Sequence, residues 1–281
     1  MLTKVRAYSS WQSAPVLPLA ELGRAETDLI QVRNIDGLDP VKAAINTSPF
    51  GSVDGVAFIG ANVTTGRNIV LTLHPNPDWD VYTYEELRRL LYLYFMPKMP
   101  TRLVFHSDDK PPVEISGYVE SSDVNAFSKD LEFIVSVICP DPYFTAVDAT
   151  VVTGVSTSDG LSPVEVEYNG NVEAGINVEV SRISDPAPSM MAVQVGDPTT
   201  SFFVVTASVS AASYFVMNSV PGQKYVQNVA IGSGVITNLL SKLREGSKWP
   251  VLLPGENDFS VITNGGHQDW QLTYYERFGG L

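Results

Sequence analysis

The sequence contains one cysteine and three histidines among its 281 residues. A lone cysteine excludes an intrachain disulfide. Cys139 lies in the apolar run FIVSVICPDPYF, where we expect a buried and unreactive thiol. His74, His106 and His267 lack the usual spacing of metal ligands, so a zinc site would need residues that only the fold brings together. We therefore expect no metal and no cofactor.

Long hydrophobic runs are also missing. None approaches the roughly 20 apolar residues that a helix needs to cross a bilayer. The N-terminal stretch MLTKVRAYSSWQSAPVLPL does not fit a signal peptide, because its apolar part is short and is interrupted by Pro15 and Pro18. We expect a protein that stays in the cytoplasm where it is made and has no membrane partner.

Positive charge is scarce. The chain has 18 Lys and Arg residues against 31 Asp and Glu residues, which gives a formal net charge of −13. A protein with this balance does not bind nucleic acid by neutralising phosphates, since that mode depends on Lys and Arg. We expect no specific nucleic-acid binding, and repulsion of any DNA that comes near.

Motifs of nucleotide-binding and hydrolytic enzymes are absent. There is no P-loop and no G-x-G-x-x-G fingerprint. The string nearest to a G-x-S-x-G nucleophile elbow is GSVDG at Gly51–Gly55, where the spacing is wrong. NIDGLD at Asn34–Asp39 lacks the Asp spacing and closing Glu of a calcium loop, and predicts a turn. The sequence does not exclude a Ser-His-Asp triad, because the fold brings the three residues of a triad together from distant positions. The sequence nevertheless favours a protein that is not an enzyme, with no catalytic residue.

Carboxylates and tryptophans leave a sugar-related function open. A glycosidase needs two carboxyl groups at a defined distance in a cleft. The acidic residues that stand close together or beside a proline are Asp78, Asp80, Asp108, Asp109 and Asp141. Trp249 and Trp270 are candidates for stacking on sugars, although packing in a core or an interface is the favoured interpretation.

One segment predicts a helix, Thr83–Phe95. Its apolar residues Leu87, Leu90, Leu91 and Tyr94 recur at the spacing of a single helical face. Thr83 and Glu86 have the spacing of a capping box, and Pro97 ends the helix. We expect this helix to pack on a sheet.

Most of the remaining first half predicts strands. Arg67–Pro75 and Thr101–Ser107 flank the helix, and Val113–Glu120 and Leu131–Ile138 alternate at period two. The segment Ser121–Asp130 is mostly polar, so we expect a long β-hairpin with an extended tip. An exposed Phe127 on this tip would suit contact with a partner.

The composition changes near Asp141–Asp148, where we expect a domain boundary. The chain beyond it is rich in Val, Thr, Ser and Gly, with turn signals at Asp159-Gly160 and Asn169-Gly170. Short strands at regular spacing predict an antiparallel β-sandwich, with a short helical turn at Ile236–Leu243. Near the end, Pro254 and Gly255 predict a hairpin corner between two strands, so Glu256, Asn257 and Asp258 are read as a solvated turn and not as a site.

Several stretches, in order, resemble the distal tail proteins (Dit) of siphophages. INTSPFGSVDGVAFIGANVTTGRNIVLTLHP at Ile45–Pro75 is similar to the N-terminal region of that family. The stretches ISGYVE, EFIVSVICPDPYF, LLPGENDFSV and TYYERFGGL follow in the family's order. The residues that carry the similarity are Gly55, Gly60, Gly66, Arg67, Asn68, Ile69, Cys139, Asp141, Pro142, Tyr143 and Phe144. The matches span nearly the whole chain and are weakest between about residues 150 and 233.

The resemblance implies a mainly β fold. It consists of an N-terminal β domain with one α-helix and a long β-hairpin, followed by a galectin-like antiparallel β-sandwich. We expect a ring-forming N-terminal domain at 1–145, with the last strand, 266–281, as a candidate to rejoin it, and the sandwich at 146–265. An unpaired aromatic strand would otherwise expose much apolar surface.

The resemblance also implies an assembly function. Six copies would form a ring at the tail tip that joins the tail tube to the baseplate hub and to receptor-binding proteins, in a virion assembled in the host cytoplasm. A heterologous interface closes such a ring, and the hairpin Val113–Ile138 is our candidate for reaching the neighbouring subunit. An acidic lumen would let DNA pass. The alternative is a carbohydrate-binding β-sandwich that aids adhesion to the host; a binding residue is not identified for either function.

Overall fold

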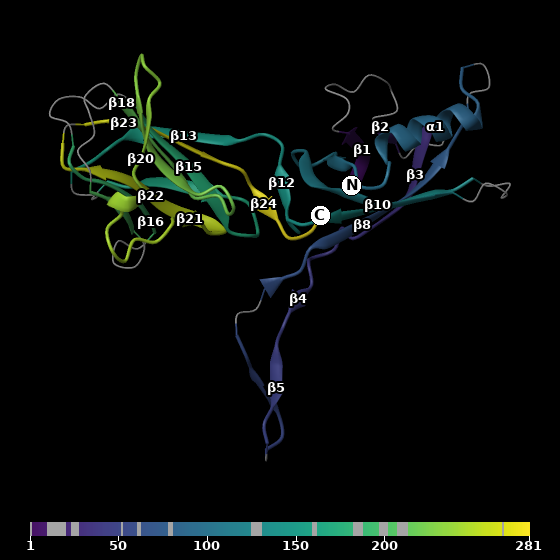
Figure 1. Ribbon diagram of the computed structural model, residues 1–281, viewed down its shortest axis with the longest axis horizontal. Coiled ribbons are helices and arrows are strands. Elements are labelled where there is room, and N and C mark those ends of the chain that lie inside the picture. The colour runs from purple at the N-terminus through teal and green to yellow at the C-terminus, as the bar shows by residue number, and fades with distance from the viewer. Residues whose placement is uncertain are drawn as a thin grey trace. The chain divides into compact units, whose positions relative to one another are not determined.

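The structure, a computed structural model, describes residues 2–9, 21–23, 28–51, 53–60, 63–77, 81–124, 131–158, 162–181, 188–196, 202–206, 213–265 and 267–281. The chain divides into two compact units. One unit comprises Met1–Val147 with Phe278–Leu281, and the other comprises Asp148–Arg277 (Figure 1). Both units are built mainly from β-strands, which confirms the expected fold class.

The first unit contains a closed β-barrel. Its strands are β1 (Leu2–Ser9), β2 (Glu21–Gly23), β3 (Ile30–Asp36), β8 (Arg67–Pro75), β9 (Pro100–Ser107), β10 (Val113–Val124) and β11 (Phe133–Cys139). They follow the order β11-β8-β3-β2-β1-β9-β10, and the ring closes because β10 also pairs with β11. Two short strands, β12 (Phe144–Ala146) and β24 (Arg277–Phe278), continue the sheet beyond β10.

The barrel strands follow the alternation in the sequence. Along β8, the residues Arg67, Ile69, Leu71 and Leu73 are buried, while the residues between them are exposed or half-buried. This strand has the predicted bounds, and β9, β10 and β11 lie within one to four residues of theirs. β10 and β11 form the expected long hairpin, with a bulge between Val119 and Ser121. Its tip, including Phe127, lies outside the described residues.

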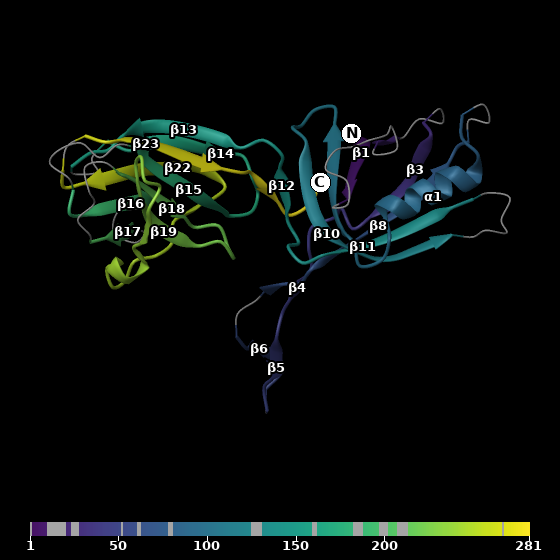
Figure 2. The same ribbon diagram turned by 45° about the horizontal axis from the view of Figure 1, so that its top comes forward.

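The helix α1 (Tyr84–Tyr94) lies against the barrel in Figure 2. Thr83 caps it as predicted, since its side chain accepts a hydrogen bond from the Glu86 amide and the Glu86 carboxylate accepts one from the Thr83 amide. Leu87, Leu91 and Tyr94 are buried in the barrel core. Among the described residues, no helix is long and apolar enough to span a membrane.

The second unit is an antiparallel β-sandwich. Its strands are β13 (Thr150–Val155), β14 (Val164–Tyr168), β15 (Ala174–Ser181), β16 (Met191–Val195), β17 (Phe202–Val205), β18 (Ser213–Asn218), β19 (Tyr225–Ala230), β20 (Ile236–Asn238), β21 (Val251–Leu252), β22 (Gly255–Thr263) and β23 (Asp269–Tyr274). One sheet has the order β13-β23-β15-β18-β19-β20, with β21 beside β15, and the other has the order β14-β22-β16-β17. Their facing side chains form one hydrophobic core.

Two local expectations for this unit need correction. The predicted helical turn at 236–243 begins as strand β20, and only Leu240–Lys242 forms a 3-10 turn. The corner at Pro254 does not join two paired strands. β21 pairs with β15 in one sheet, whereas β22 pairs with β14 and β16 in the other, so the chain crosses between the sheets at this point.

The end of the chain belongs to both units. Within the segment 266–281, β23 pairs with β13 and β15 inside the sandwich. Only Phe278–Leu281 belong to the first unit, where Phe278 packs against the barrel core.

Candidate functional site: an apolar arm and its anchor

A two-stranded arm leaves the barrel between β3 and β8. It contains the strands β4 (Ala43–Ala44), β5 (Thr47–Pro49), β6 (Val56–Phe58) and β7 (Val63–Thr64). β4 pairs with β7, and β5 pairs with β6. Figure 1 shows this ribbon extending away from the ends of β3 and β8. These pairings hold the two sides of the arm together as a ribbon that projects from the first unit.

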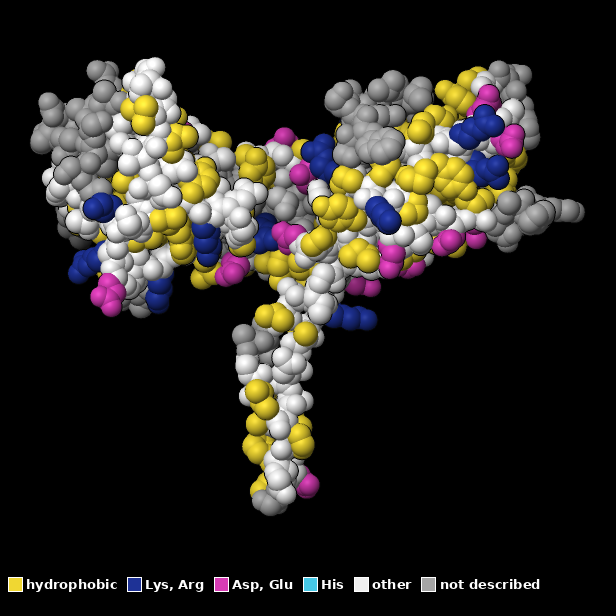
Figure 3. Space-filling view, viewed as in Figure 1, with side chains coloured by type: hydrophobic (Ala, Val, Ile, Leu, Met, Phe, Trp, Pro, Cys, Tyr) yellow, Lys and Arg dark blue, Asp and Glu magenta, His cyan; other side chains and the backbone are white. Residues whose placement is uncertain are grey.

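The arm exposes apolar side chains along its length. Seven large hydrophobic residues are each more than half exposed: Ile45, Phe50, Val53, Val56, Phe58, Ile59 and Val63. Phe58, at 71%, is the most exposed of all large hydrophobic side chains in the described chain. The only charged residue between positions 43 and 64 is Asp54. Figure 3 shows these apolar groups on both sides of the arm. Exposed apolar side chains gathered on one element are typical of a surface that contacts another molecule.

Arg67 anchors the base of the arm. Its Nε donates to the Pro142 carbonyl at 2.7 Å, and one terminal nitrogen donates to the carbonyls of Gly37 and Asp39, the latter at 2.8 Å. The other terminal nitrogen donates to the Gly279 carbonyl. The guanidinium, with the whole residue 6% exposed, thus joins three separate chain segments through backbone oxygens.

The electrostatics around Arg67 fit this structural role. Desolvation by burial lowers the pKa of Arg67, and the nearby Cys139 and Asp39 oppose that shift. The guanidinium carbon lies 4.5 Å from the centre of the Phe144 ring, a favourable cation–π contact. The same burial raises the pKa of the Cys139 thiol to about 11. Cys139 is therefore a protonated, buried thiol at neutral pH, as expected.

The last residues of the chain complete the anchor. The Leu281 amide donates to the Leu38 carbonyl at 3.0 Å, and the Val41 amide donates to the Gly279 carbonyl at 3.3 Å. A Cβ on Gly280 would lie 2.9 Å from the Pro40 nitrogen, so a larger residue does not fit without a shift. The C-terminal tail therefore holds Leu38–Val41, the segment that leads into the arm.

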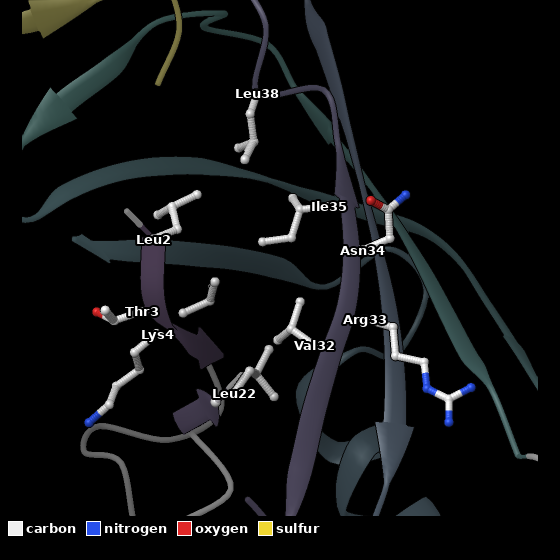
Figure 4. A pocket seen from close by; sticks show the side chains of 11 residues that line it. Leu2, Thr3, Lys4, Leu22, Val32, Arg33, Asn34, Ile35 and Leu38 are labelled. Carbon is white, nitrogen blue, oxygen red and sulfur yellow. The ribbon is translucent and has the colours of Figure 1, made fainter. Parts of the chain in front are cut away.

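A recess lies on the barrel beside the base of the arm. β2 pairs with β3 at Gly23 and Gln31, and beyond this point no strand among the described residues lies between β1 and β3. The recess encloses about 210 Å³. Figure 4 shows Leu2, Val32, Ile35 and Leu38 pointing into it, while Lys4 and Arg33 point away. These four aliphatic side chains are half-buried and pack on the barrel core.

The histidine candidates from the sequence do not gather into a metal site in the described part of the chain. His74 and His267 each contact a backbone carbonyl through Nδ1, that of Leu131 at 3.0 Å and that of Ser156 at 3.1 Å respectively. No group of three or more His, Cys, Asp or Glu residues suited to a metal is present among the described residues. Asp78 and Asp80 lie outside the described residues.

Asp141, Trp249 and Trp270, which were also candidates from the sequence, make contacts that stabilise the fold. Asp141 accepts a hydrogen bond from the Tyr143 amide at 3.2 Å, which stabilises the turn before β12. Trp270 is 2% exposed and packs against Phe259 in the sandwich core. Trp249 is half-buried, with the Phe203 ring 4.8 Å away. Neither described tryptophan presents an open ring on which a sugar could stack.

Glu256, Asn257 and Asp258 lie at the start of β22, just after the crossing at Pro254, and Asn257 holds that crossing. The Asn257 side chain, in a residue that is 5% exposed, donates to the carbonyls of Leu253 and Gly255 and accepts from the Leu253 amide, with all three distances between 2.7 and 2.9 Å. Glu256 and Asp258 are exposed. The reading of these three residues as a solvated turn is therefore wrong, because they belong to β22, pair with β14 and include a buried side chain.

Sequence reasoning missed the arm as a separate element. Two features of the sequence could have indicated the arm. Apolar residues alternate with Gly, Ser and Asn between positions 43 and 64, and this stretch contains one charged residue. The strand pattern predicts that such residues enter a core. Nothing local in the sequence shows that the ribbon leaves the barrel.

A scan against protein-family models finds no match, and a search of curated proteins finds none either. Among solved structures, the chain is similar to the Dit protein of phage SPP1, described as a paradigm of the hub adsorption apparatus in phages that infect Gram-positive bacteria. The TM-score is 0.67 at 15% identity, covering 98% of this chain and 99% of that chain. The chain thus has the fold of a Dit-like phage tail component.

Two structures of the phage P2 baseplate in its activated conformation are also similar. With Ca the TM-score is 0.48 at 9% identity, covering 100% of both chains. With Sr it is 0.45 at 9% identity, covering 96% of this chain and 97% of that chain.

Proposed function

We propose that this chain is a structural protein of the tail tip of a long-tailed bacteriophage, and that six copies form a ring joining the tail tube to the baseplate hub. The observation that carries the proposal is the end-to-end similarity to SPP1 Dit, which spans 98% of this chain. In this proposal the barrel unit forms the ring, and the galectin-like sandwich faces the adsorption apparatus. The virion is assembled in the host cytoplasm, and its receptor-binding proteins attach around the ring.

The arm is the element best suited to join neighbouring subunits. A ring needs a heterologous interface, in which two different surfaces of the same chain meet. The arm supplies a projecting apolar surface with a single charged residue, Asp54. Burying a side chain such as Phe58 contributes about 1.5–3 kcal/mol. By contrast, β11 pairs with β8 over its whole length, and β10 pairs with β9 from Val113 to Tyr118, so less of the hairpin β10–β11 is open to a partner.

The acidic character of the chain suits passage of DNA through the ring. Figure 3 shows Asp and Glu side chains along one edge of the first unit. Asp36, Glu120 and Asp123 are exposed acidic residues of β3 and β10. A lumen lined by such groups offers no anchor for phosphates. A reconstruction of the assembled ring tests this part of the proposal, and a lumen lined by Lys and Arg overturns it.

The alternative function, binding of carbohydrate by the sandwich, lacks a supporting observation in the described residues. Its best candidates were Trp249 and Trp270, which are packed against Phe203 and Phe259. A glycan-binding assay with the purified protein separates the two functions, because the adaptor function requires no sugar affinity.

The proposal is tested by light scattering and negative-stain microscopy. We expect a mass of six copies and a ring with an open centre, formed by the chain alone or with its tube and hub proteins. A chain that stays monomeric under all of these conditions overturns the proposal.

Two matched deletions identify the joining element. Replacing residues 46–60 by a short Gly-Ser turn shortens the arm, and replacing residues 125–130 by a similar turn shortens the hairpin between β10 and β11. Both variants keep the barrel strands, so circular dichroism should match the parent. We expect the first deletion to abolish rings and the second to retain them; the reverse result would assign the contact to the hairpin.

A further inference from the structure

We infer that the recess between β1 and β3 receives the arm of a second copy of this chain, with Phe58 as the anchoring side chain. The inference rests on the proposed ring and identifies the surface that the arm contacts. It depends on the shape and chemistry of two described surfaces of the first unit, the recess and the arm.

The recess lies beyond the described end of β2. β1 pairs with β2 only from Lys4 to Arg6, and β3 pairs with β2 only at Gln31. Past Gly23 no described strand joins Leu2–Thr3 to Val32–Asp36, so aliphatic side chains that would normally lie beneath a strand are left half-exposed. The open space is about 210 Å³.

The chemistry of the recess matches the chemistry of the arm. Leu2, Val32, Ile35 and Leu38 line the recess in Figure 4, with the charged ends of Lys4 and Arg33 directed elsewhere. The arm is almost uncharged and its most exposed side chain is Phe58. Contact between them therefore buries apolar area without removing an ionised group from water, which would be costly.

The occupant is a second copy because the arm points away from its own barrel. Figures 1 and 2 both show the ribbon leading outward from the ends of β3 and β8. Leu38 lies at the root of this ribbon and also lines the recess, and its carbonyl is held by the Leu281 amide. A projecting surface and a receiving surface on one chain make a heterologous contact, which closes into a ring when the rotation between copies allows it.

The inference is tested by cross-linking between two purified variants, Phe58→Cys and Ile35→Cys, that carry different affinity tags. The native Cys139 is fully buried and does not interfere. On mixing and mild oxidation, we expect a disulfide-linked species that contains both tags. Because each variant carries one of the two cysteines, an arm folded onto its own recess gives no such species.

The matched control replaces Ile35→Cys with Val151→Cys, an apolar site in the second unit that is 51% exposed. This pair should cross-link at least tenfold less. A second measurement uses Phe58→Ser, with Val155→Ser as its control on a residue 52% exposed. Loss of a buried Phe should weaken association between copies about tenfold or more.

The outcomes separate this inference from the proposed function. Rings that form normally while Phe58→Cys and Ile35→Cys fail to cross-link overturn the recess assignment and leave the ring intact. Equal cross-linking to Ile35→Cys and Val151→Cys also overturns it, because the arm then has no preferred site. Absence of rings in the parent protein, with or without its tail partners, refutes the proposed function itself.

Discussion

Arg67→Ala is the most informative single change to the first unit. Arg67 donates to four backbone carbonyls, those of Gly37, Asp39, Pro142 and Gly279. Removing the side chain leaves these oxygens without their charged donor in a place that is largely closed to water. The change tests whether the arm base and the chain terminus are held by this one residue.

The expected loss follows from the contacts. The Gly279 carbonyl still accepts from the Val41 amide. Counting about 1 kcal/mol for each of the other three carbonyls gives about 3 kcal/mol in the free energy of unfolding. Loss of the cation–π contact with Phe144 adds roughly 1 kcal/mol. Against this, the variant no longer desolvates a guanidinium, the effect that lowers the pKa of Arg67. We expect a net loss of about 3–4 kcal/mol. Arg67→Lys should lose about half as much, because an ammonium cannot reproduce the planar fork.

Urea denaturation followed by circular dichroism measures the loss, and hydrogen exchange localises it. Amides of Val41 and Leu281 should exchange faster in Arg67→Ala, since they lie in the bonded network that Arg67 holds. The control is Arg102→Ala, an arginine with a cation–π contact to Tyr8 and a salt bridge of 3.1 Å to Glu114, but with its side chain 45% exposed. Its cost should stay below about 1 kcal/mol. If Arg67→Ala costs no more than the control, the anchor reasoning is wrong.

Other predictions concern single contacts. Thr83→Ala should lower the free energy of unfolding by about 1 kcal/mol through loss of the capping box, and an unchanged thermal midpoint would contradict this. Asn257→Ala should cost about 2–3 kcal/mol, whereas Glu256→Gln should stay within about 0.5 kcal/mol in the same denaturant titration. The Cys139 thiol should resist alkylation at pH 8 until the chain unfolds; rapid labelling of the folded protein would show that it is accessible. Since its pKa is raised from 9.0 to about 11 by folding, the folded state keeps a proton that the unfolded state loses, and stability should fall as pH rises through that window.

In the first unit, local sequence patterns predict the bounds of single strands and of the helix well. β8 occupies the predicted residues because buried residues alternate with more exposed ones along Arg67–Pro75, as the sequence pattern indicates. The helix α1 begins and ends within one residue of its prediction, since Thr83 and Glu86 form a cap that depends only on neighbours in the chain. The crossing between sheets at Pro254 was misread as a hairpin because a turn signal does not specify which strands pair across it.

For the candidate site, too, the sequence predicts some features and only the fold shows the others. The position of Arg67 stood out through its resemblance to a family motif, but its four acceptors come from positions near 38, 142 and 279 and share no local signal. The recess arises from where β2 stops relative to β1 and β3, which is a property of pairing and not of composition. The residue type of Phe58 does not show whether its side chain is buried in a core or exposed on the surface.

The sequence by itself determined the mainly β character, the capped helix, the buried thiol and the lack of an enzymatic motif, because each depends on composition or on residues within a few positions of one another. Only the tertiary structure decided that the barrel closes through β10 and β11, that the tail Phe278–Leu281 returns to hold Leu38–Val41, and that the arm leaves the barrel. These features depend on contacts between segments far apart in the chain, and such contacts are selected by the packing of the whole unit and not by any one stretch of it.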